Sequence, residues 1–515
     1  MSLLAIDLGS SQCKAVVFRA NGEALSSAVQ TYAPEFPEPS HCEMDPERFW
    51  VAAVQASKLV TRNLRRDPIE AVCFSSHGET FIPVGKHGKA VGPAILNIDT
   101  RATSEAAWCE KSIGRKRLFG MTGLVTHAMY SLPKIVWLRQ HQPNLTAATA
   151  RFLSVPAYLL GHLGLPPYID YSLAGRFLAF DVRRHEWSDE ILSLAQTKRS
   201  QFPIPVPAGT IAGKLKAGAA RTLGVPAGTP VVVGGHDQVC AALGAGAIDK
   251  GRVSDSMGTY ECLLATSDVP ALDDQALAVS LNSYNHVVPG KYATLAYFPS
   301  GIMVSWFRNL VMGPRRSSRK SSAIPDQAAA YEWLESQCPA APSGLCITPH
   351  LIGTCNPDFN ERARAVIAGL SPKSGRGHIY KGILEGIACE LANVCALLAK
   401  ACRDFHDIYA TGGGAQSPLG LKLRASLTAR RIHVMKSPES ACLGGAILAG
   451  VAVGIYSGIS EAVREVVHEK ETVDPDPDVR ASYTAQIEKY RLLYSALTPV
   501  RDFDVSHLSN RRQSA

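Results

Sequence analysis

Three short polar segments of this 515-residue chain contain the residue types that a phosphoryl transfer needs. That chemistry requires backbone amides that hold phosphates, a carboxylate for a metal ion, and an acid or base beside the acceptor hydroxyl. Each segment comes directly after an apolar, strand-like run, so we expect each to lie where a strand ends. The segments are DLGSSQCK (7–14), GGHDQ (234–238) and TGGGAQSP (411–418).

In the first segment, Asp7 is predicted to end a strand, where a carboxylate can meet a metal ion such as Mg²⁺. Gly9, Ser10 and Ser11 would let the turn approach a phosphate, and Lys14 would supply a point charge. The same residues also suit an ordinary hairpin in which Asp7 caps the turn. This segment alone leaves both interpretations open.

The triple glycine 412–414 lies between a predicted strand, 407–411, and a predicted helix with Ser417 at its N-cap and Pro418 at N1. Bare backbone and a helix N-terminus could meet the phosphates of a nucleotide. A plain strand-to-helix turn has the same pattern. The nucleotide interpretation and the structural one therefore both stay open.

Asp237 follows the short apolar run 231–233, so its carboxylate could face a cleft or cap the next helix. Other chemistries have weaker support. His77 and His236 lack ligand-spaced partners for a metal, and the thirteen cysteines carry no nucleophile signature. The serines of the first segment lack the G-x-S-x-G elbow of a hydrolase. Together the three segments favour one phosphoryl-transfer site.

Composition and charge exclude several classes of function. The chain has 53 Lys and Arg against 45 Asp and Glu, a formal charge of +8 that is thinly spread. Its basic clusters lack the interleaved aromatic residues of a base-stacking surface, so we expect no nucleic-acid partner. The odd number of cysteines, with no C-x-x-C pair, argues against a disulfide framework and a zinc site. The expected compartment is a reducing cytoplasm.

We also expect no membrane segment. The first apolar run reaches Asp7 too soon for the apolar region of a signal peptide. Residues 440–460 are free of charge, but their five glycines and many alanines favour a tightly packed core helix and turn.

The elements that must position these residues alternate between strand and helix patterns, which predicts an α/β fold with sheets covered by helices. Hairpin-like units at Gly9 and Gly258 lie 249 positions apart, close to half the chain. They predict two similar domains that each contribute one turn to a shared cleft. The predicted ranges are 1–248, 249–500 and a tail, 501–515.

Two further segments have distinctive patterns. Apolar residues from Ile379 to Leu398 recur at helical spacing and predict a helix that faces a core. Residues 313–345 are rich in Ser, Pro, Ala and basic residues, and are predicted to form a mobile surface insertion.

Several ordered motifs make the chain resemble the FGGY family of carbohydrate kinases, within the actin, Hsp70 and hexokinase superfamily. DLGSSQCK is similar to the family's first phosphate motif, with Ser10 and Gln12 in place of Thr and Ser. Lys134 and Trp137 match its Lys-x-x-Trp signature. TGGGAQSP resembles its adenosine motif. Further matches are HCEMDPERFW (41–50), DYSLAGRFLAFDVRRHEW (170–187), ARAVIAGLSPKSGRGHIYKGILEG (363–386) and ESACLGGAILA (439–449).

The resemblance implies two ribonuclease-H-like domains that close over ATP, Mg²⁺ and a sugar. It implies that Asp237 is the general base that takes the proton of the acceptor hydroxyl, and that Asp7 holds Mg²⁺ through water. The implied nucleotide- and phosphate-binding residues are Ser10, Ser11, Lys14, Gly258, Thr259, Gly413, Gly414, Ala415 and Gln416. The implied substrate-binding residues are Gly78, Glu79, Asp99, Arg101, Asp237 and Gln238.

The expected enzyme is thus an ATP-dependent phosphotransferase whose acceptor is an alcohol group of a small sugar, such as xylulose or fuculose, or of a polyol. Departures from the family fall in the sugar pocket: Gly78-Glu79 stands where xylulose-type members have Met-His, and Asn97 stands in place of a customary Trp. The alternative is a superfamily ATPase, or a sugar-binding protein without kinase activity. The chain could form a homodimer.

Overall fold

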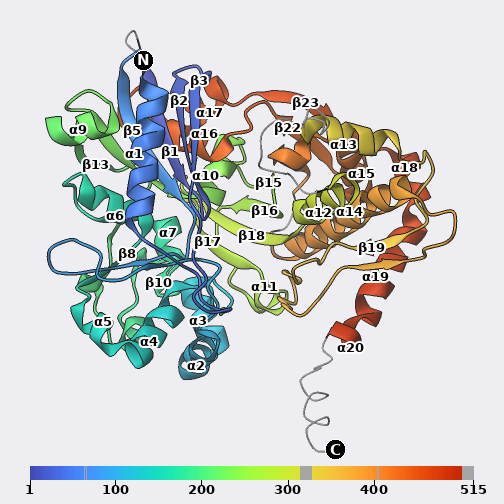
Figure 1. Cartoon of the computed structure of the whole chain (residues 1–515), viewed down its shortest axis with the longest axis horizontal. Coiled ribbons are helices and arrows are strands. Elements are labelled where there is room, and N and C mark those ends of the chain that lie inside the picture. The colour runs from blue at the N-terminus through green and yellow to red at the C-terminus, as the bar shows by residue number, and fades with distance from the viewer. Residues whose placement is uncertain (63, 65–66, 314–326, 403–404, 502–515) are drawn as a thin grey trace, which may run out of the picture. The chain divides into compact units, whose positions relative to one another are not determined.

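The computed structural model describes the chain except residues 63, 65–66, 314–326, 403–404 and 502–515, and has the α/β architecture expected from the sequence (Figure 1). Its residues form two compact units, neither of which is a single stretch of sequence. The predicted domain ranges stay a prediction. Unit 1 comprises Met1–Ser254, Leu264–Leu295 and Met435–His468; unit 2 comprises Asp255–Leu263, Ala296–Val434 and Glu469–Ala515.

Unit 1 is built on a six-stranded sheet of order β13-β14-β5-β1-β2-β3. Strands β1 and β2 form the predicted antiparallel hairpin, and β1, β5 and β14 run parallel. Because carboxyl ends of parallel strands meet at one edge of a sheet, the residues that follow these three strands lie close together. The bounds are β1 Ser2–Leu8, β2 Gln12–Arg19, β3 Ala24–Thr31, β5 Ile69–Ser76, β13 Ile211–Lys214 and β14 Pro230–His236.

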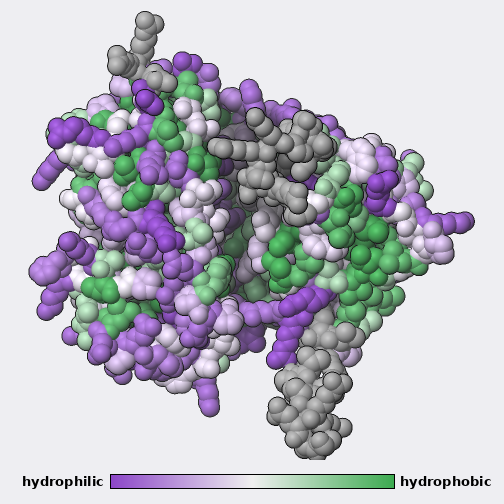
Figure 2. Space-filling model, in the orientation of Figure 1, coloured by the Kyte–Doolittle hydropathy of each residue, from purple (hydrophilic) through white to green (hydrophobic). Residues whose placement is uncertain are grey.

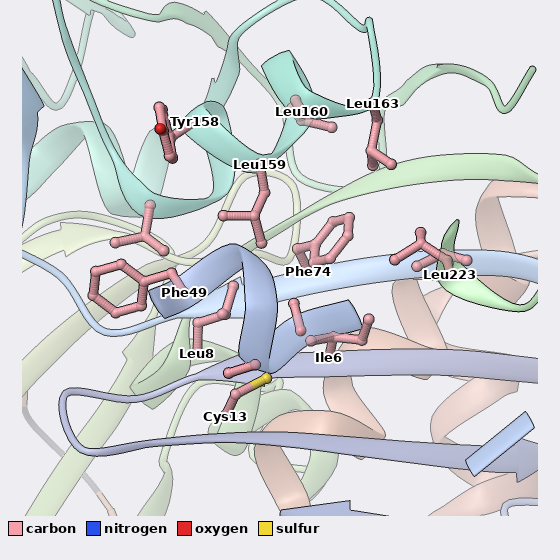
Figure 3. Packing of buried hydrophobic residues seen from close by; sticks show 14 of the residues in the cluster. Ile6, Leu8, Cys13, Phe49, Phe74, Tyr158, Leu159, Leu160, Leu163 and Leu223 are labelled. Atoms are coloured by element: carbon pink, nitrogen blue, oxygen red, sulfur yellow. The ribbon is translucent and has the colours of Figure 1, made fainter. Parts of the chain in front are cut away.

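Alternation along β1 divides its side chains between two covered faces of the sheet. Leu4, Ile6 and Leu8 join a core cluster that includes Phe49 of helix α1 (Glu47–Thr61) (Figure 3). The opposite face is covered by α16 (Ser440–Ala452), which packs against β1, β5 and β14. Burial of each large side chain contributes about 1.5–3 kcal/mol. The charge-free segment is thus a core helix, as predicted.

Helix α16 also crosses α10 (Asp237–Gly244) at van der Waals distance. A Cβ on Gly444 would lie 2.0 Å from the carbonyl oxygen of Cys240, a backbone atom that cannot move without the helix. The neighbouring Gly445 has room, since its Cβ would lie 3.5 Å from Cβ of Ala5. The close crossing seats the helix that begins with Asp237.

The two glycines give a matched pair of variants. Gly444→Ala is expected to lower the free energy of unfolding by about 3 kcal/mol, because the added methyl group forces the helices apart. Gly445→Ala is expected to be neutral or to stabilise by up to about 1 kcal/mol, because alanine favours the helix. Urea unfolding of both proteins measures this, and equal stabilities would contradict the packing described.

The second sheet has the order β17-β18-β16-β15-β21-β22-β23. Strands β15 and β16 form the predicted hairpin at Gly258, and β21 has the predicted bounds. Ser417 caps the helix that follows the glycine segment, α15, by accepting a hydrogen bond from the N–H of Gly420, with Pro418 at N1 as predicted. The bounds are β15 Arg252–Met257, β16 Tyr260–Ser267, β17 Asn282–Asn285, β18 Tyr292–Pro299, β21 Asp407–Thr411, β22 Arg431–Met435, β23 Glu469–Val473 and α15 Pro418–Thr428.

Among the described residues one helix, α14 (Arg376–Ala401), is long and apolar enough to cross a membrane. Most of it is buried inside unit 2, where it packs against α15 and β19 (Cys346–Thr348), which is the environment of a core helix. The predicted insertion 313–345 is corrected in part. Residues 314–326 lie outside the described residues, whereas Gln327–Ser336 form α13, which packs against α14.

Charged side chains on the surface of unit 1 are often paired with a nearby opposite charge. Arg48 binds Glu35, and Arg117 binds Glu190. On the face of this unit that Figure 2 shows, hydrophilic side chains are scattered among apolar ones. The expected absence of a nucleic-acid partner stays a prediction.

Candidate active site

The turn after β1 carries the first predicted site residues. Oδ1 of Asp7 accepts a hydrogen bond of 2.7 Å from Ser75, the residue beside it in β5. Burial raises the pKa of Asp7, while Ser75 and the positive charge of Lys14 lower it. Ser10 and Ser11 lie at the tip of this turn, where Ser11 is exposed. The turn thus presents hydroxyls and backbone beside a carboxylate.

Lys14 stands opposite Asp7 in the hairpin register. Its Nζ is 2.5 Å from Oε2 of Glu439, and both side chains are one quarter exposed. Glu439 occupies the N-cap position of α16 but makes no capping hydrogen bond with its side chain. The ion pair therefore joins the phosphate-motif hairpin to the helix that covers the sheet. Sequence reasoning did not identify Glu439 as part of the site.

His77 links the ends of β1 and β5. Its Nδ1 donates to the carbonyl oxygen of Leu8 at 2.7 Å, and its Nε2 accepts from the hydroxyl of Thr80 at 2.7 Å. Burial lowers the pKa of His77, so the ring is neutral. Both ring nitrogens are used for structure, which agrees with the absence of metal-ligand spacing in the sequence.

Asp237 is the first residue of α10, directly after β14, and its side chain is 21% exposed. Its pKa lies well above the ordinary value of 3.8 because burial disfavours the charge, and because the carboxylates of Asp7 and Glu79 add repulsion. The N–H of Gln238 and the guanidinium of Arg176 oppose this rise. A carboxylate with a raised pKa is a stronger base than an ordinary one once it is ionised.

The residue before Asp237 contacts it from the sheet side. Nε2 of His236 is 3.4 Å from Oδ1 of Asp237, and Nδ1 is 3.0 Å from the hydroxyl oxygen of Tyr284. Burial, Arg176 and His77 lower the pKa of His236 far below its usual value. The imidazole beside the carboxylate is therefore neutral and does not itself lower the pKa of Asp237 by a positive charge.

Glu79 forms a buried ion pair with Arg176, a residue that sequence reasoning did not single out. The guanidinium donates through Nε and Nη2 to Oε1 of Glu79. It also lies 5.2 Å and 5.0 Å from the ring centres of Tyr130 and Tyr284. Its Nη1 is buried without a hydrogen-bond partner among the described residues. A Cβ on Gly78 would lie 2.7 Å from Cγ of Arg176, so the glycine admits this side chain.

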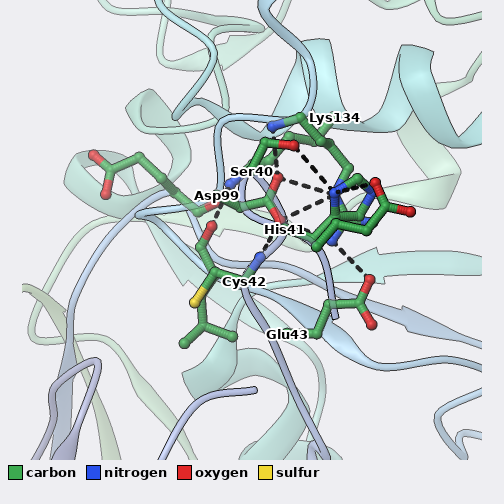
Figure 4. Close-up of polar contacts among 10 residues, drawn as sticks. Ser40, His41, Cys42, Glu43, Asp99 and Lys134 are labelled. Atoms are coloured by element: carbon green, nitrogen blue, oxygen red, sulfur yellow. Dashed lines mark hydrogen bonds and ion pairs between the residues drawn. The ribbon is translucent and has the colours of Figure 1, made fainter. Parts of the chain in front are cut away.

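Asp99 and Arg101 form a separate buried network in unit 1 (Figure 4). Arg101 donates to both oxygens of Asp99 and to Glu43 at 2.7 Å, and its guanidinium lies 5.0 Å from the ring centre of Trp137. The Asp99 and Arg101 side chains have no exposed surface. Their predicted contact with an acceptor stays a prediction.

Lys134 interacts electrostatically with Asp99 and binds the backbone of Glu79. Its Nζ donates to the backbone carbonyl oxygens of Glu79, at 3.1 Å, and Leu96, at 2.8 Å (Figure 4). Burial lowers its pKa to about 8. Both residues of the Lys-x-x-Trp signature thus have structural roles. Lys134 holds the backbone of Glu79 by a hydrogen bond, and the ring of Trp137 packs against the guanidinium of Arg101.

Unit 2 brings its two predicted phosphate segments together. Gly258 and Thr259 form an exposed turn between β15 and β16, closed by the N–H of Gly258 and the carbonyl oxygen of Tyr260 at 2.9 Å. The glycine segment packs on this turn, since a Cβ on Gly412 would lie 2.8 Å from the carbonyl oxygen of Met257. The predicted nucleotide-binding residues Gly413, Gly414, Ala415 and Gln416 form a short 3-10 helix, Gly413–Gln416.

Apart from Asp99 and Arg101, the predicted residues of each unit gather in one place. Unit 1 groups Asp7, Lys14, Glu79 and Asp237 around the ends of three parallel strands. The arrangement offers a base beside two carboxylates and a lysine, which suits removal of a proton from a hydroxyl next to a phosphate.

Comparisons with known proteins agree with this chemistry. The family model described as the N-terminal domain of the FGGY family of carbohydrate kinases matches residues 2–244, and the model of the C-terminal domain matches residues 253–453. The gluconokinase of Bacillus subtilis is 25% identical over 97% of this chain and 98% of its own length. The xylulose kinase of the same organism is 24% identical over 99% of both.

Solved structures show the same fold. The gluconate kinase of Lactobacillus acidophilus matches with a TM-score of 0.86 and 21% identity, over 96% of this chain and 98% of that one. A glycerol kinase of Plasmodium falciparum with ADP matches with a TM-score of 0.83 and 21% identity, over 95% and 97%. The family and the two-domain kinase fold predicted from the motifs are confirmed. The chain belongs to the FGGY family of carbohydrate kinases, and it is an ATP-dependent phosphotransferase with an alcohol group as acceptor.

Proposed function

We propose that this kinase transfers the γ-phosphate of ATP to a hydroxyl of a small neutral sugar or polyol, such as a pentulose or hexulose, with Asp237 as general base. The observation that carries the proposal is the position of Asp237 at the end of β14, with a pKa raised by burial and by Asp7 and Glu79. A base must lie beside the attacking hydroxyl and be ionised when it takes the proton. Activity is therefore expected to rise with pH through the pKa of Asp237.

The chain's own residues fit the bound groups that the reaction requires. Mg²⁺ is typically held by one or two carboxylates, waters and phosphate oxygens, so it does not need a cluster of three protein ligands. We assign Asp7 to Mg²⁺. The negative charges of Asp237 and Glu439 repel its carboxylate, and a bound cation would relieve this repulsion. When bound, the ion neutralises charge that develops on the transferred phosphoryl group.

The remaining roles follow from the same positions. We assign Ser10, Ser11 and Lys14 of unit 1 to the β- and γ-phosphates, and Gly258 and Thr259 of unit 2 to phosphate binding. Gly413, Gly414, Ala415 and Gln416 are assigned to the ADP portion, and Gly78, Glu79 and Gln238 to the acceptor. The exposed turns of these segments support the assignment, since backbone amides in turns can approach phosphate closely.

The charges around Asp237 favour a neutral acceptor. Lys14 and Arg176, the cations that act on Asp7 and Asp237, are already paired with Glu439 and Glu79. An acceptor carboxylate placed ~5 Å from one uncompensated carboxylate would be repelled by about 3 kcal/mol at an effective dielectric constant of ~20. We therefore expect an aldonate to be a poorer substrate than a neutral sugar, although gluconokinases are among the relatives.

ADP release by the purified protein tests this function. The panel contains xylulose, ribulose, fuculose, rhamnulose, tagatose, erythritol and glycerol as neutral acceptors and gluconate as the anionic one. At least one neutral acceptor is expected to exceed gluconate at least tenfold in kcat/KM. Preference for gluconate would refute the neutral class, and ADP release that needs no acceptor would favour an ATPase of the same superfamily.

We also propose a reducing cytoplasm as the compartment. All thirteen cysteines have free thiols, and most are buried. Burial raises the pKa of buried thiols such as Cys42, to about 11, which keeps them unreactive. Assembly into a homodimer stays a prediction.

A further inference from the structure

The backbone that places Asp237 leaves the regular sheet ladder just before this residue. Strand β14 pairs with β5 from Val231 to Val233 and again at His236, with an irregularity in the register between them. A Cβ on Gly235 would lie 2.3 Å from Cγ1 of Val287 and 2.9 Å from Oγ of Ser172. This short stretch is therefore enclosed by side chains of other segments, and its path depends on them.

Ser172 supplies the hydrogen bond that holds this stretch. Its Oγ accepts from the backbone N–H of His236 at 2.9 Å. Because an N–H can only donate, the hydroxyl oxygen is the acceptor and its own proton is free to point elsewhere. That proton is directed to Oδ2 of Asp170, 2.5 Å away. The three groups form a directed chain that ends on the residue immediately before Asp237.

Asp170 is itself fixed. It caps the short helix α7 (Tyr171–Gly175) by accepting from the N–H groups of Ser172, at 2.8 Å, and Leu173, at 3.1 Å. It is 1% exposed and lines a small cavity whose other walls are mainly apolar, among them Phe74 and Leu160. Burial raises its pKa to about 6. At neutral pH it is therefore an ionised acceptor that orients the Ser172 hydroxyl.

We propose that Ser172, oriented by Asp170, is a positioning residue for phosphoryl transfer, because its hydroxyl holds the backbone N–H of His236 and thereby sets the place of the Asp237 carboxylate. The inference rests on the proposed role of Asp237 as general base. Helix α7 packs against β14, so Ser172 and His236 both belong to the core of unit 1. Without the hydroxyl, the N–H of His236 either loses its hydrogen-bond partner or forms a regular hydrogen bond with strand β5. Either change moves the first residues of α10.

Steady-state kinetics of Ser172→Ala test the inference on the whole chain with the best neutral acceptor. The expected result is a kcat lower by about 10- to 100-fold, since a displacement of ~1 Å at a reacting group costs rate on this scale. KM for ATP is expected to stay within about twofold. Ser172→Thr, which keeps the hydroxyl, is expected to recover most of the lost kcat. Ser57→Ala is the matched control, because Ser57 is also fully buried and bonds a backbone atom, the carbonyl oxygen of Leu223.

A double-mutant cycle separates this inference from the proposed base. If Ser172 acts through Asp237, Ser172→Ala has little further effect on kcat in an Asp237→Asn protein. An equal fold-loss in both backgrounds, or a loss matched by Ser57→Ala, would overturn the positioning role. Near-normal turnover of Asp237→Asn alone would instead refute the base. Should Ser172→Ala fail to fold, Ser172→Cys takes its place, since a thiol keeps the volume but bonds weakly, and unchanged kcat there would equally overturn the role.

Discussion

Asp237→Asn is expected to lower kcat by about 10³-fold, within the range of 10²–10⁴ that general-base catalysis contributes. Asparagine keeps the shape of the side chain and can still contact Nε2 of His236, but it cannot take a proton. Because Asp237 itself is not assigned to the nucleotide, KM for ATP is expected to stay within about twofold. Coupled ADP assays measure both quantities. Asp249→Asn, at an exposed carboxylate of the same unit, is the control and should leave kcat unchanged.

The same substitution should make the folded protein more stable at neutral pH. The pKa of Asp237 in the folded state lies well above the unfolded value of 3.8, so keeping this carboxylate ionised costs folding free energy. That cost is absent below the unfolded pKa, grows as pH rises toward the folded pKa, and is fully present above it. Asp237→Asn removes the cost, so its melting temperature at pH 7 should exceed that of the parent. A lower melting temperature with unchanged kcat would contradict both assignments.

Arg176→Met is expected to cost about 3–5 kcal/mol of folding free energy, the usual effect of removing one partner of a buried ion pair. Both side chains of the pair are 3% exposed, so the Glu79 carboxylate would be left buried without its cation. Loss of Arg176 should also raise the pKa of Asp237 further, because the guanidinium now lowers it. The acid limb of the pH profile would therefore move to higher pH. Urea unfolding and the pH dependence of kcat measure the two effects.

The double variant Arg176→Met/Glu79→Gln decides whether the loss comes from the uncompensated charge. It is expected to recover much of the stability, because no ionised group then remains buried there. Arg117→Met serves as the control, since its ion pair with Glu190 has side chains 66% and 44% exposed and should contribute at most about 1 kcal/mol. Equal losses for Arg176→Met and the control, or no recovery in the double variant, would contradict the proposed pairing.

Local patterns in the sequence were sufficient for the elements that carry the site. The hairpin of β1 and β2, the strand β21 and the cap at Ser417 each depend on residues close together in the chain, so spacing and capping chemistry predict them. The position of Asp237 after a strand was predicted in the same way. Sequence patterns could not decide whether these residues act in catalysis, because the same patterns also form ordinary turns.

The contacts that complete the site join residues far apart in the chain. Arg176 and Glu79 are 97 positions apart, and Lys14 and Glu439 are 425 apart, so no local periodicity reports either pair. Arg176 lies in a segment whose family match was recognised, yet a single arginine at the end of a short helix gives no sign of its partner. For Asp99 and Arg101, the family resemblance implied a contact with the acceptor, which stays a prediction. The sequence did not reveal their buried pairing with each other and with Glu43.

Burial also decides the chemistry of groups that look alike in the sequence. Asp170 and Asp237 each stand at the beginning of a helix, but one caps that helix and the other has its carboxylate beside Asp7 and Glu79. Only packing distinguishes a structural carboxylate from a candidate base.

Transfer of labelled phosphate from γ-labelled ATP tests the central claim most directly. With the parent protein and the best neutral acceptor, the label is expected to appear in the phosphorylated acceptor, with about 10³-fold slower transfer by Asp237→Asn. Label that appears as inorganic phosphate at the same rate with or without any acceptor, or transfer by Asp237→Asn at the parent's rate, would contradict the claim.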